Sequence, residues 1–391
     1  MPGGKGFVDS PTWFKDKFGF EEASFADTKR KFEFADGFLL CKHSGDKFRV
    51  GSFETPSLAE LSEKADSSKL QDRISFENVT GAVKTMILDK QNEGAVFQVA
   101  SQFNCLEMNE PGARPENGVT RYYCDATQGP ACALACPAAT VYRNYFAPDG
   151  SGQAGKGNQI DCLADVAMLL NNDKDKHWKM QNGYCLPVTP DGQGIAAASQ
   201  KLVKDQELSQ KVRDVLRVGI HWDTEVKTGT HGVCQVFSSA VPVAYAKQVK
   251  SKDWEPLARC VLEGSYEATL AAASILARKR QQRVTVYLTA VGGGAFGNRS
   301  NWIHDAMDRA LKVYAQAPLD VKLVHFGSVP RSTYTDLEKG RKPRKPGQLP
   351  PDKVAAAPGA GTPGEGDGDG EAAAPAEVEE ELEEEEAFAT S

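Results

Sequence analysis

The chain has 391 residues, of which 40% are apolar and 25% are charged, proportions typical of a globular protein. Its net charge of −7 is concentrated at the end, since residues 351–391 hold thirteen acidic residues and one lysine, which leaves the rest mildly basic. No apolar run reaches 18 residues and the N-terminus lacks an apolar leader, so we expect neither a membrane span nor a secretory signal. Nine cysteines, an odd number, indicate free thiols and an intracellular protein, cytoplasmic or nuclear.

The first 73 residues are expected to be an arm followed by a β-rich addition. Residues 1–20 are rich in glycine and aromatic residues, which predicts a loose arm. Apolar residues alternate over 31–53 and are interrupted by Gly-containing turns, which predicts a small antiparallel meander. Ser57 and Glu60 have the spacing of a capping box and predict that a helix starts there.

A strand, a short helix and a second strand are predicted over residues 74–78, 81–88 and 95–100. Polar residues follow the second strand, and the carboxyl end of such a strand faces the ligand crevice of an open α/β sheet. These residues are Ser101, Gln102 and Asn104.

The loop-rich stretch 118–146 contains a second polar group and a short small-residue helix over 131–135. The polar residues of this group are Asp125, Thr127 and Gln128. The three cysteines of the stretch fit no zinc spacing, so we predict no metal site, and no motif predicts a cofactor.

The middle of the chain predicts alternating helices and strands. Helices are expected over 159–182, 196–215 and 254–276, the last with a buried stripe at helical spacing. Strands are expected over 215–220 and 233–243.

A glycine-rich loop between a strand, 284–291, and a helix that begins near Ser300 gives the sharpest functional signal. Such a loop directs main-chain N–H groups and a helix N-terminus toward one point, where an anion such as phosphate binds. A tight turn without a ligand is the simpler alternative. The candidate binding residues of this loop are Gly292, Gly293, Gly294, Ala295, Phe296, Gly297 and Asn298. The glycines also match a dinucleotide-binding pattern, but only one strand, 321–326, follows, which argues against a Rossmann domain.

Taken in order, residues 74–327 resemble a macro domain, the ADP-ribose-binding fold, in a divergent form similar to poly(ADP-ribose) glycohydrolases. Residues 233–242 resemble the middle strand of that family, and 292–297 resemble the loop that wraps the diphosphate and places an aromatic residue near the distal ribose. Residues 95–104 resemble the strand that delivers an asparagine to that ribose. The resemblance implies a three-layer α/β/α domain over 74–330 with a mixed central sheet, and ADP-ribose or a related nucleotide diphosphate as ligand.

The chain departs from that family at the ligand site. Ala82 stands where the family has an aspartate that binds the adenine amine, and residues 125–130 replace the first glycine-rich loop. The paired glutamates of the glycohydrolase signature are not present.

Two functions therefore stay open. A hydrolase acting at the distal ribose needs a carboxylate, and Asp125, with Glu107 as the next nearest, is the candidate base; Asn104 and Gln128 would hold the ribose. Asp125 could equally be an Asx-turn residue. The alternative function is a non-catalytic reader of ADP-ribose or of ADP-ribosylated macromolecules.

Residues 331–391 are predicted to lie outside the globular part. A short basic run, 340–346, precedes a stretch rich in Ala, Pro, Gly and Glu that is typical of disorder. This tail could contact basic proteins, although a solubilising tail is the simpler interpretation. We expect neither a membrane nor a nucleic acid as partner.

Overall fold

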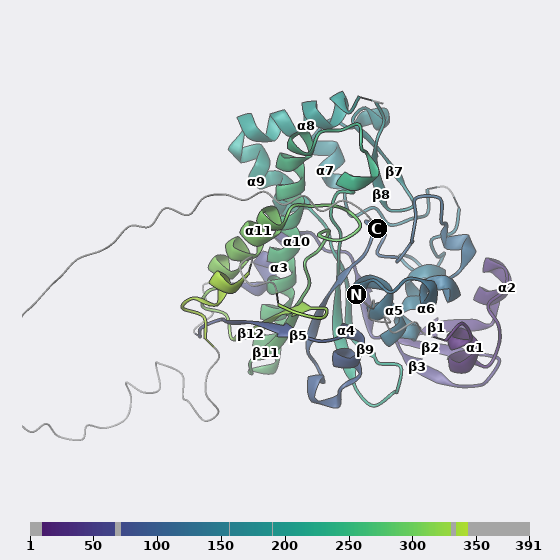
Figure 1. Cartoon of the computed structure of the whole chain (residues 1–391). Coiled ribbons are helices and arrows are strands. Elements are labelled where there is room, and N and C mark those ends of the chain that lie inside the picture. Colours follow the sequence, from purple (N-terminus) through teal and green to yellow (C-terminus); the bar gives the residue numbers. More distant parts are fainter. Residues whose placement is uncertain (1–9, 67–71, 156, 190, 330–333, 343–391) are drawn as a thin grey trace, which may run out of the picture. The chain divides into compact units, whose positions relative to one another are not determined.

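A seven-stranded mixed sheet in the order β4-β9-β10-β6-β11-β12-β5 lies at the centre of the computed structural model (Figure 1). The model describes residues 10–66, 72–155, 157–189, 191–329 and 334–342. The strands are β4 Ser52–Glu54, β5 Ser75–Thr80, β6 Val96–Ala100, β9 Gly219–Glu225, β10 Gly232–Ser238, β11 Val284–Leu288 and β12 Leu319–His325. The five strands from β10 to β5 run parallel to one another, β9 runs antiparallel to its neighbour β10, and β4 runs antiparallel to β9 and so in the same direction as the five. The predicted α/β fold with a mixed central sheet is confirmed.

Helices cover both faces of this sheet (Figure 1). On one face the long α10 packs against four other helices: α3 Leu58–Ala65, α8 Gln193–Lys204, α9 Gln206–Val215, α10 Ser251–Arg280 and α11 Ser300–Val313. On the other face lie α4 Val83–Leu88, α5 Gln128–Ala135 and α6 Pro137–Tyr145. Within the described part of the chain, no helix combines the length and the apolar character needed to cross a membrane.

The N-terminal segment is a packed layer. The meander forms as predicted, with β1 Phe32–Ala35, β2 Phe38–Cys41 and β3 Lys47–Arg49, and it follows α1 Trp13–Phe18 and α2 Phe25–Arg30. The prediction of a loose arm is wrong for residues 10–20, because their aromatic side chains are buried and Trp13 Nε1 donates to the carbonyl of Thr120 at 2.7 Å. The capping box of Ser57 and Glu60 is confirmed.

Two predicted elements differ from the structure. In place of a helix over 159–182 the chain forms the short α7 Ala164–Leu169, a 3-10 turn at Asp173–Asp175, and then a hairpin of β7 Trp178–Gln181 and β8 Tyr184–Pro187. Asn182 and Gly183 both have positive φ in its turn, and this Asn-Gly pair is a local hairpin signal that helical periodicity concealed. The strand predicted over 215–220 begins later, because Val215 ends α9.

Short 3-10 helices connect these elements: η2 Lys90–Asn92, η3 Pro115–Asn117, η4 Thr120–Cys124, η5 Asp173–Asp175, η6 Val243–Tyr245 and η7 Thr335–Glu338. The last one, η7, lies within the segment predicted to be a tail, but it packs against β5. Tyr334 and Leu337 are buried, and Glu338 accepts hydrogen bonds from Asn78. The boundaries at 73 and 330 stay predictions, and the acidic tail lies outside the described residues.

All nine cysteines are free thiols, as predicted; eight are buried and Cys124 is exposed. In the described ranges no three His, Cys, Asp or Glu side chains are placed to hold a metal ion.

Candidate functional site

A cavity of about 460 Å³ opens at the carboxyl ends of β6, β11 and β12. It exists because β6 and β11 pair only at two register positions, Val96–Val286 and Phe97–Tyr287, before the two strands separate. Gln128 takes the place of the missing strand partner. Its Oε1 accepts the amide hydrogen of Ala100, and its Nε2 donates to the carbonyl of Gln98, both at 2.8 Å.

The glycine loop of residues 292–298 forms one wall of the cavity. Three of its amides have main-chain acceptors: Gly293 N donates to Ala290 O and Gly297 N donates to Gly294 O, both at 3.0 Å, and Asn298 N donates to Gly292 O at 2.9 Å. Neither Gly293 nor Gly297 lines the cavity.

The remaining loop amides that lie at the cavity have no acceptor. No hydrogen bond to any described residue is made by the backbone N–H groups of Gly292, Gly294, Ala295 and Phe296. These same four residues line the cavity. Because main-chain N–H groups require a partner, theirs must come from solvent or from a ligand.

Asn298 supports the loop from behind and does not line the cavity. Its Nδ2 donates to the carbonyls of Val241 at 2.9 Å and Gly292 at 3.3 Å, and its own amide donates to Gly292 O at 2.9 Å. Gly292 has φ of +75°, and a Cβ there would lie 2.5 Å from the Cβ of Ala240, so this turn requires glycine. The structure thus places Asn298 as a scaffold of the loop.

The helix that follows the loop contributes less than predicted. Ser300 is the first helical residue of α11, Arg299 is the N-cap, and no side-chain cap is present. No described residue of α11 lines the cavity. The anion-binding potential of this wall therefore belongs to the loop amides.

Five of the six predicted polar residues lie at the cavity. Ser101, Gln102, Asp125, Thr127 and Gln128 all line the cavity.

Two of the residues expected to hold a ribose instead form hydrogen bonds with other parts of the protein. Asn104 is fully buried away from the cavity, where its Nδ2 donates to Gln159 and its Oδ1 accepts from the amide of Leu106. The Gln128 amide group is taken up by β6.

Asp125 forms the predicted Asx-turn and also lines the cavity. Its Oδ1 accepts from the amide of Thr127 at 2.8 Å, which is an Asx-turn. The residue is half-buried and lines the cavity, and Oδ2 forms no hydrogen bond with the described residues. One carboxylate oxygen is therefore used by the turn and the other is available for chemistry.

Four aromatic residues of the cavity wall were not predicted as site residues: Tyr123, Tyr184, Tyr245 and Phe326. Tyr184 of β8 and Tyr245 of η6 surround Phe296, with the three ring centroids 5.3–5.6 Å apart. Phe326 lies on the opposite rim at the end of β12 and is 75% exposed. Its position after a buried strand in the same sheet as the glycine loop was the signal that could have identified it.

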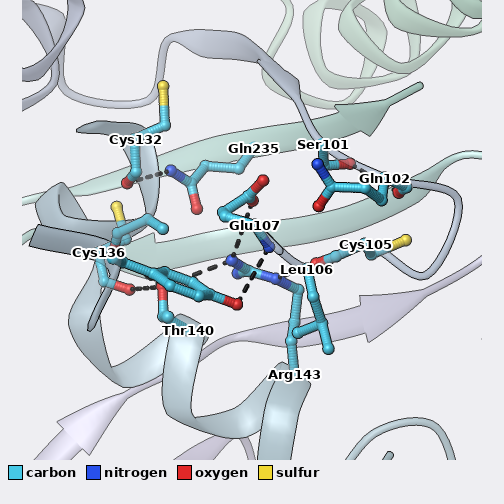
Figure 2. A network of polar contacts seen from close by, with 12 residues as sticks. Ser101, Gln102, Cys105, Leu106, Glu107, Cys132, Cys136, Thr140, Arg143 and Gln235 are labelled. Atoms are coloured by element: carbon cyan, nitrogen blue, oxygen red, sulfur yellow. Dashed lines mark hydrogen bonds and ion pairs between the residues drawn. The ribbon is translucent and has the colours of Figure 1, made fainter. Parts of the chain in front are cut away.

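A buried ion pair lies beside the cavity (Figure 2). Glu107 Oε1 is 3.8 Å from Arg143 Nη2, and both side chains are almost fully buried. Arg143 Nε donates to the carbonyl of Cys105 at 2.8 Å, and its guanidinium lies 3.9 Å from the ring centroid of Phe237. Burial raises the pKa of Glu107 to about 8, while Arg143 opposes the shift and Asp125 adds to it.

No family model and no curated protein matches the sequence. Solved structures do match. The poly(ADP-ribose) glycohydrolase of Deinococcus radiodurans in complex with ADP-ribose is 8% identical, with a TM-score of 0.41 over 74% of this chain and 94% of that chain. The enzyme of Thermomonospora curvata is 12% identical, with a TM-score of 0.40 over 81% of this chain and 97% of that one.

The same Thermomonospora curvata enzyme bound to the inhibitor ADP-HPD is 14% identical, with a TM-score of 0.38. The chain is structurally similar to bacterial poly(ADP-ribose) glycohydrolases. The resemblance seen in the sequence is confirmed as a similarity of structure at low identity, over 74–81% of the chain.

Replacing Asn298 with Ala removes both side-chain hydrogen bonds that hold the loop. We expect the free energy of unfolding to fall by about 1–3 kcal/mol, measured by urea denaturation. Asn301→Ala, on the exposed side of α11, is the matched control and should change it by less than about 0.5 kcal/mol. Equal midpoints for Asn298→Ala and the wild type would show that the loop is held by other contacts.

Proposed function

We propose that the cavity binds ADP-ribose or a closely related nucleotide diphosphate. One observation carries this proposal. The four loop amides without acceptors, at Gly292 and at residues 294–296, belong to residues that line the cavity. Consecutive main-chain N–H groups form a concave site for phosphate oxygens. Lys84 is the one cationic side chain among the described residues of the wall, so the diphosphate would be bound chiefly by main-chain groups.

The two ends of the cavity differ in a way that orients such a ligand. Phe326, together with Val83 and Val324, forms an apolar rim suited to the flat face of adenine. At the other end Ser101 and Asp125 supply polar groups for a ribose. The glycine loop itself carries the aromatic Phe296, which also lines the cavity.

Hydrolysis at the distal ribose is the activity that this orientation supports. Asp125, through its second carboxylate oxygen, would accept a proton from water as the water oxygen bonds to the anomeric carbon. The leaving group departs with the bonding electron pair and takes up a proton from solvent. The polar character of this end, next to a half-buried carboxylate, supports the assignment.

A non-catalytic reader of ADP-ribose or of ADP-ribosylated macromolecules is the second candidate. It is favoured by the engagement of Asn104 and Gln128 in structural hydrogen bonds, which leaves fewer groups to hold the reacting ribose. The reader would use the same amides and the same rim, but it would release no product.

Gly294→Val tests the diphosphate position. A Cβ at Gly294 enters open space and φ there is not positive, so the variant should fold normally while its side chain occupies the cavity. We expect the Kd for ADP-ribose, measured by calorimetry, to rise at least about tenfold, or about 1.4 kcal/mol. Ala59→Val, at an exposed position of α3 that does not line this cavity, is the control. Unchanged binding by Gly294→Val would place the ligand elsewhere.

Phe326→Ala tests the adenine position. Loss of a stacking ring costs about 1–3 kcal/mol per base, so the Kd for ADP-ribose should rise about five- to 150-fold with little change in stability, because the ring is exposed. Phe326→Trp should retain binding, and Val313→Ala, at an exposed apolar position outside the cavity wall, serves as control. Wild-type affinity in Phe326→Ala would contradict this orientation.

Asp125→Asn separates the two candidate functions. Asparagine keeps the Asx-turn acceptor but removes the base, so ADP-ribose should bind within about tenfold of wild type while release of ADP-ribose from a modified protein falls about 10²- to 10⁴-fold. Chromatography of the released nucleotide measures it. Turnover at the wild-type rate excludes Asp125 as the base, and a wild-type protein that binds without turnover is a reader.

A further inference from the structure

The hydroxyl group of Tyr266 lies at the point where the chain leaves β11 and enters the glycine loop. Tyr266 belongs to α10 and is fully buried. Its hydroxyl donates to the carbonyl of Thr289 at 2.7 Å and accepts a hydrogen bond from the amide of Val291 at 3.0 Å. The Val291 amide also donates to the carbonyl of Thr289 at 2.9 Å, which makes a three-residue turn. One side chain of another element therefore closes this turn.

The two main-chain groups that Tyr266 contacts belong to successive peptide units. The Thr289 carbonyl is part of the unit before Ala290, and the Val291 amide is part of the unit after it. Because each peptide unit is planar, fixing one of its polar groups restricts the orientation of the whole unit. The next unit carries the Gly292 amide, the first of the four loop amides that have no acceptor among the described residues. The Tyr266 hydroxyl thus restricts the direction in which the loop begins.

Other polar residues of α10 contact the strands that lie next in the sheet. Ser265 Oγ donates to the carbonyl of Ser239, directly after β10, at 3.3 Å. Thr269 Oγ1 accepts a hydrogen bond from Gln98 Nε2 of β6 at 3.2 Å, and Gln98 Oε1 in turn accepts the amide of Thr289. These contacts connect α10 to β10, β6 and the end of β11. The helix is therefore a fixed support from which Tyr266 holds the turn.

The Tyr266 hydroxyl uses both its hydrogen and its oxygen in this turn. Burial raises the pKa of the hydroxyl well above its usual value, so the group keeps its proton at neutral pH and can donate and accept at once. Phenylalanine would fill the same space without either function. It would leave the Thr289 carbonyl without this donor, and it would leave the buried Val291 amide with the strained geometry of the three-residue turn alone.

We propose that Tyr266 is a positioning residue for the diphosphate, because its hydroxyl holds the start of the glycine loop so that the amides of Gly292 and of residues 294–296 face the cavity. Tyr266 does not line the cavity, so it acts on the ligand only through the loop. The inference rests on the proposed function for the identity of the ligand. Asn298 closes the loop from its last residue, and Tyr266 holds the turn that leads into it.

Tyr266→Phe, compared with Tyr287→Phe in the full chain, tests the proposal. Tyr287 is the matched control, since it lies on β11, outside the cavity wall, and its hydroxyl donates to Asn92 at 2.7 Å. Both variants are titrated with ADP-ribose in a calorimeter at a temperature where urea denaturation shows them to be folded. We expect the Kd to rise about tenfold or more in Tyr266→Phe and to stay within about twofold of wild type in Tyr287→Phe. A purely structural role would lower the free energy of unfolding without changing the Kd of the folded protein.

Wild-type affinity in Tyr266→Phe overturns the proposal, and so does an equal loss of affinity in Tyr287→Phe. The ¹H–¹⁵N spectra of the ligand-free variants separate this inference from the proposed function. In Tyr266→Phe the amides of residues 291–296 should move while those of Ser101 and Gln102 stay in place. A wild-type protein that does not bind ADP-ribose refutes the proposed function, whereas loop amides that stay in place in Tyr266→Phe refute the role of Tyr266.

Discussion

The completion of main-chain hydrogen bonds where β6 and β11 separate is the constraint on which the site depends. Side-chain amides replace most of the strand-to-strand hydrogen bonds that are lost there. Gln128 bonds to β6, the Gln98 side chain accepts a hydrogen bond from the amide of Thr289 at 3.3 Å, and Asn298 donates to the carbonyls of Val241 and Gly292. Only the amides at the cavity wall are left over. A sheet that opens in this way produces a polar, concave site in an otherwise apolar wall without needing a buried charge.

The cavity wall contains few charged side chains. The buried pair of Glu107 and Arg143 lies beside it; desolvation raises the pKa of the acid, and the guanidinium of Arg143 opposes that shift.

The parts of the site that could be predicted from sequence are those built from contiguous residues. The glycine loop follows β11 directly, and the polar residues Ser101 and Gln102 follow β6 directly, so both can be recognised from a predicted strand and the residues after it. Asn298 and Asn104 were assigned to the ligand because an asparagine in a loop has the same local appearance whether its amide faces a cavity or a distant carbonyl. The partner of Asn298, the carbonyl of Val241, is 57 residues away.

The walls that come from distant segments could not be predicted. Tyr184 reaches Phe296 only because an Asn-Gly hairpin folds over the loop, and Phe326 joins the rim through the sheet order, which no local pattern encodes. For the same reason the residues 10–20, expected to be loose, instead form an aromatic cluster whose partners lie in the meander.

The most direct measurement of the central claim is the ¹H–¹⁵N spectrum of the loop during titration with ADP-ribose. The amides of Gly294, Ala295 and Phe296 should shift strongly toward a hydrogen-bonded environment, because they gain phosphate oxygens as acceptors. The amide of Gly293 should move less, since it already donates to the carbonyl of Ala290. Saturating ADP-ribose that leaves the first three resonances in place would contradict the account.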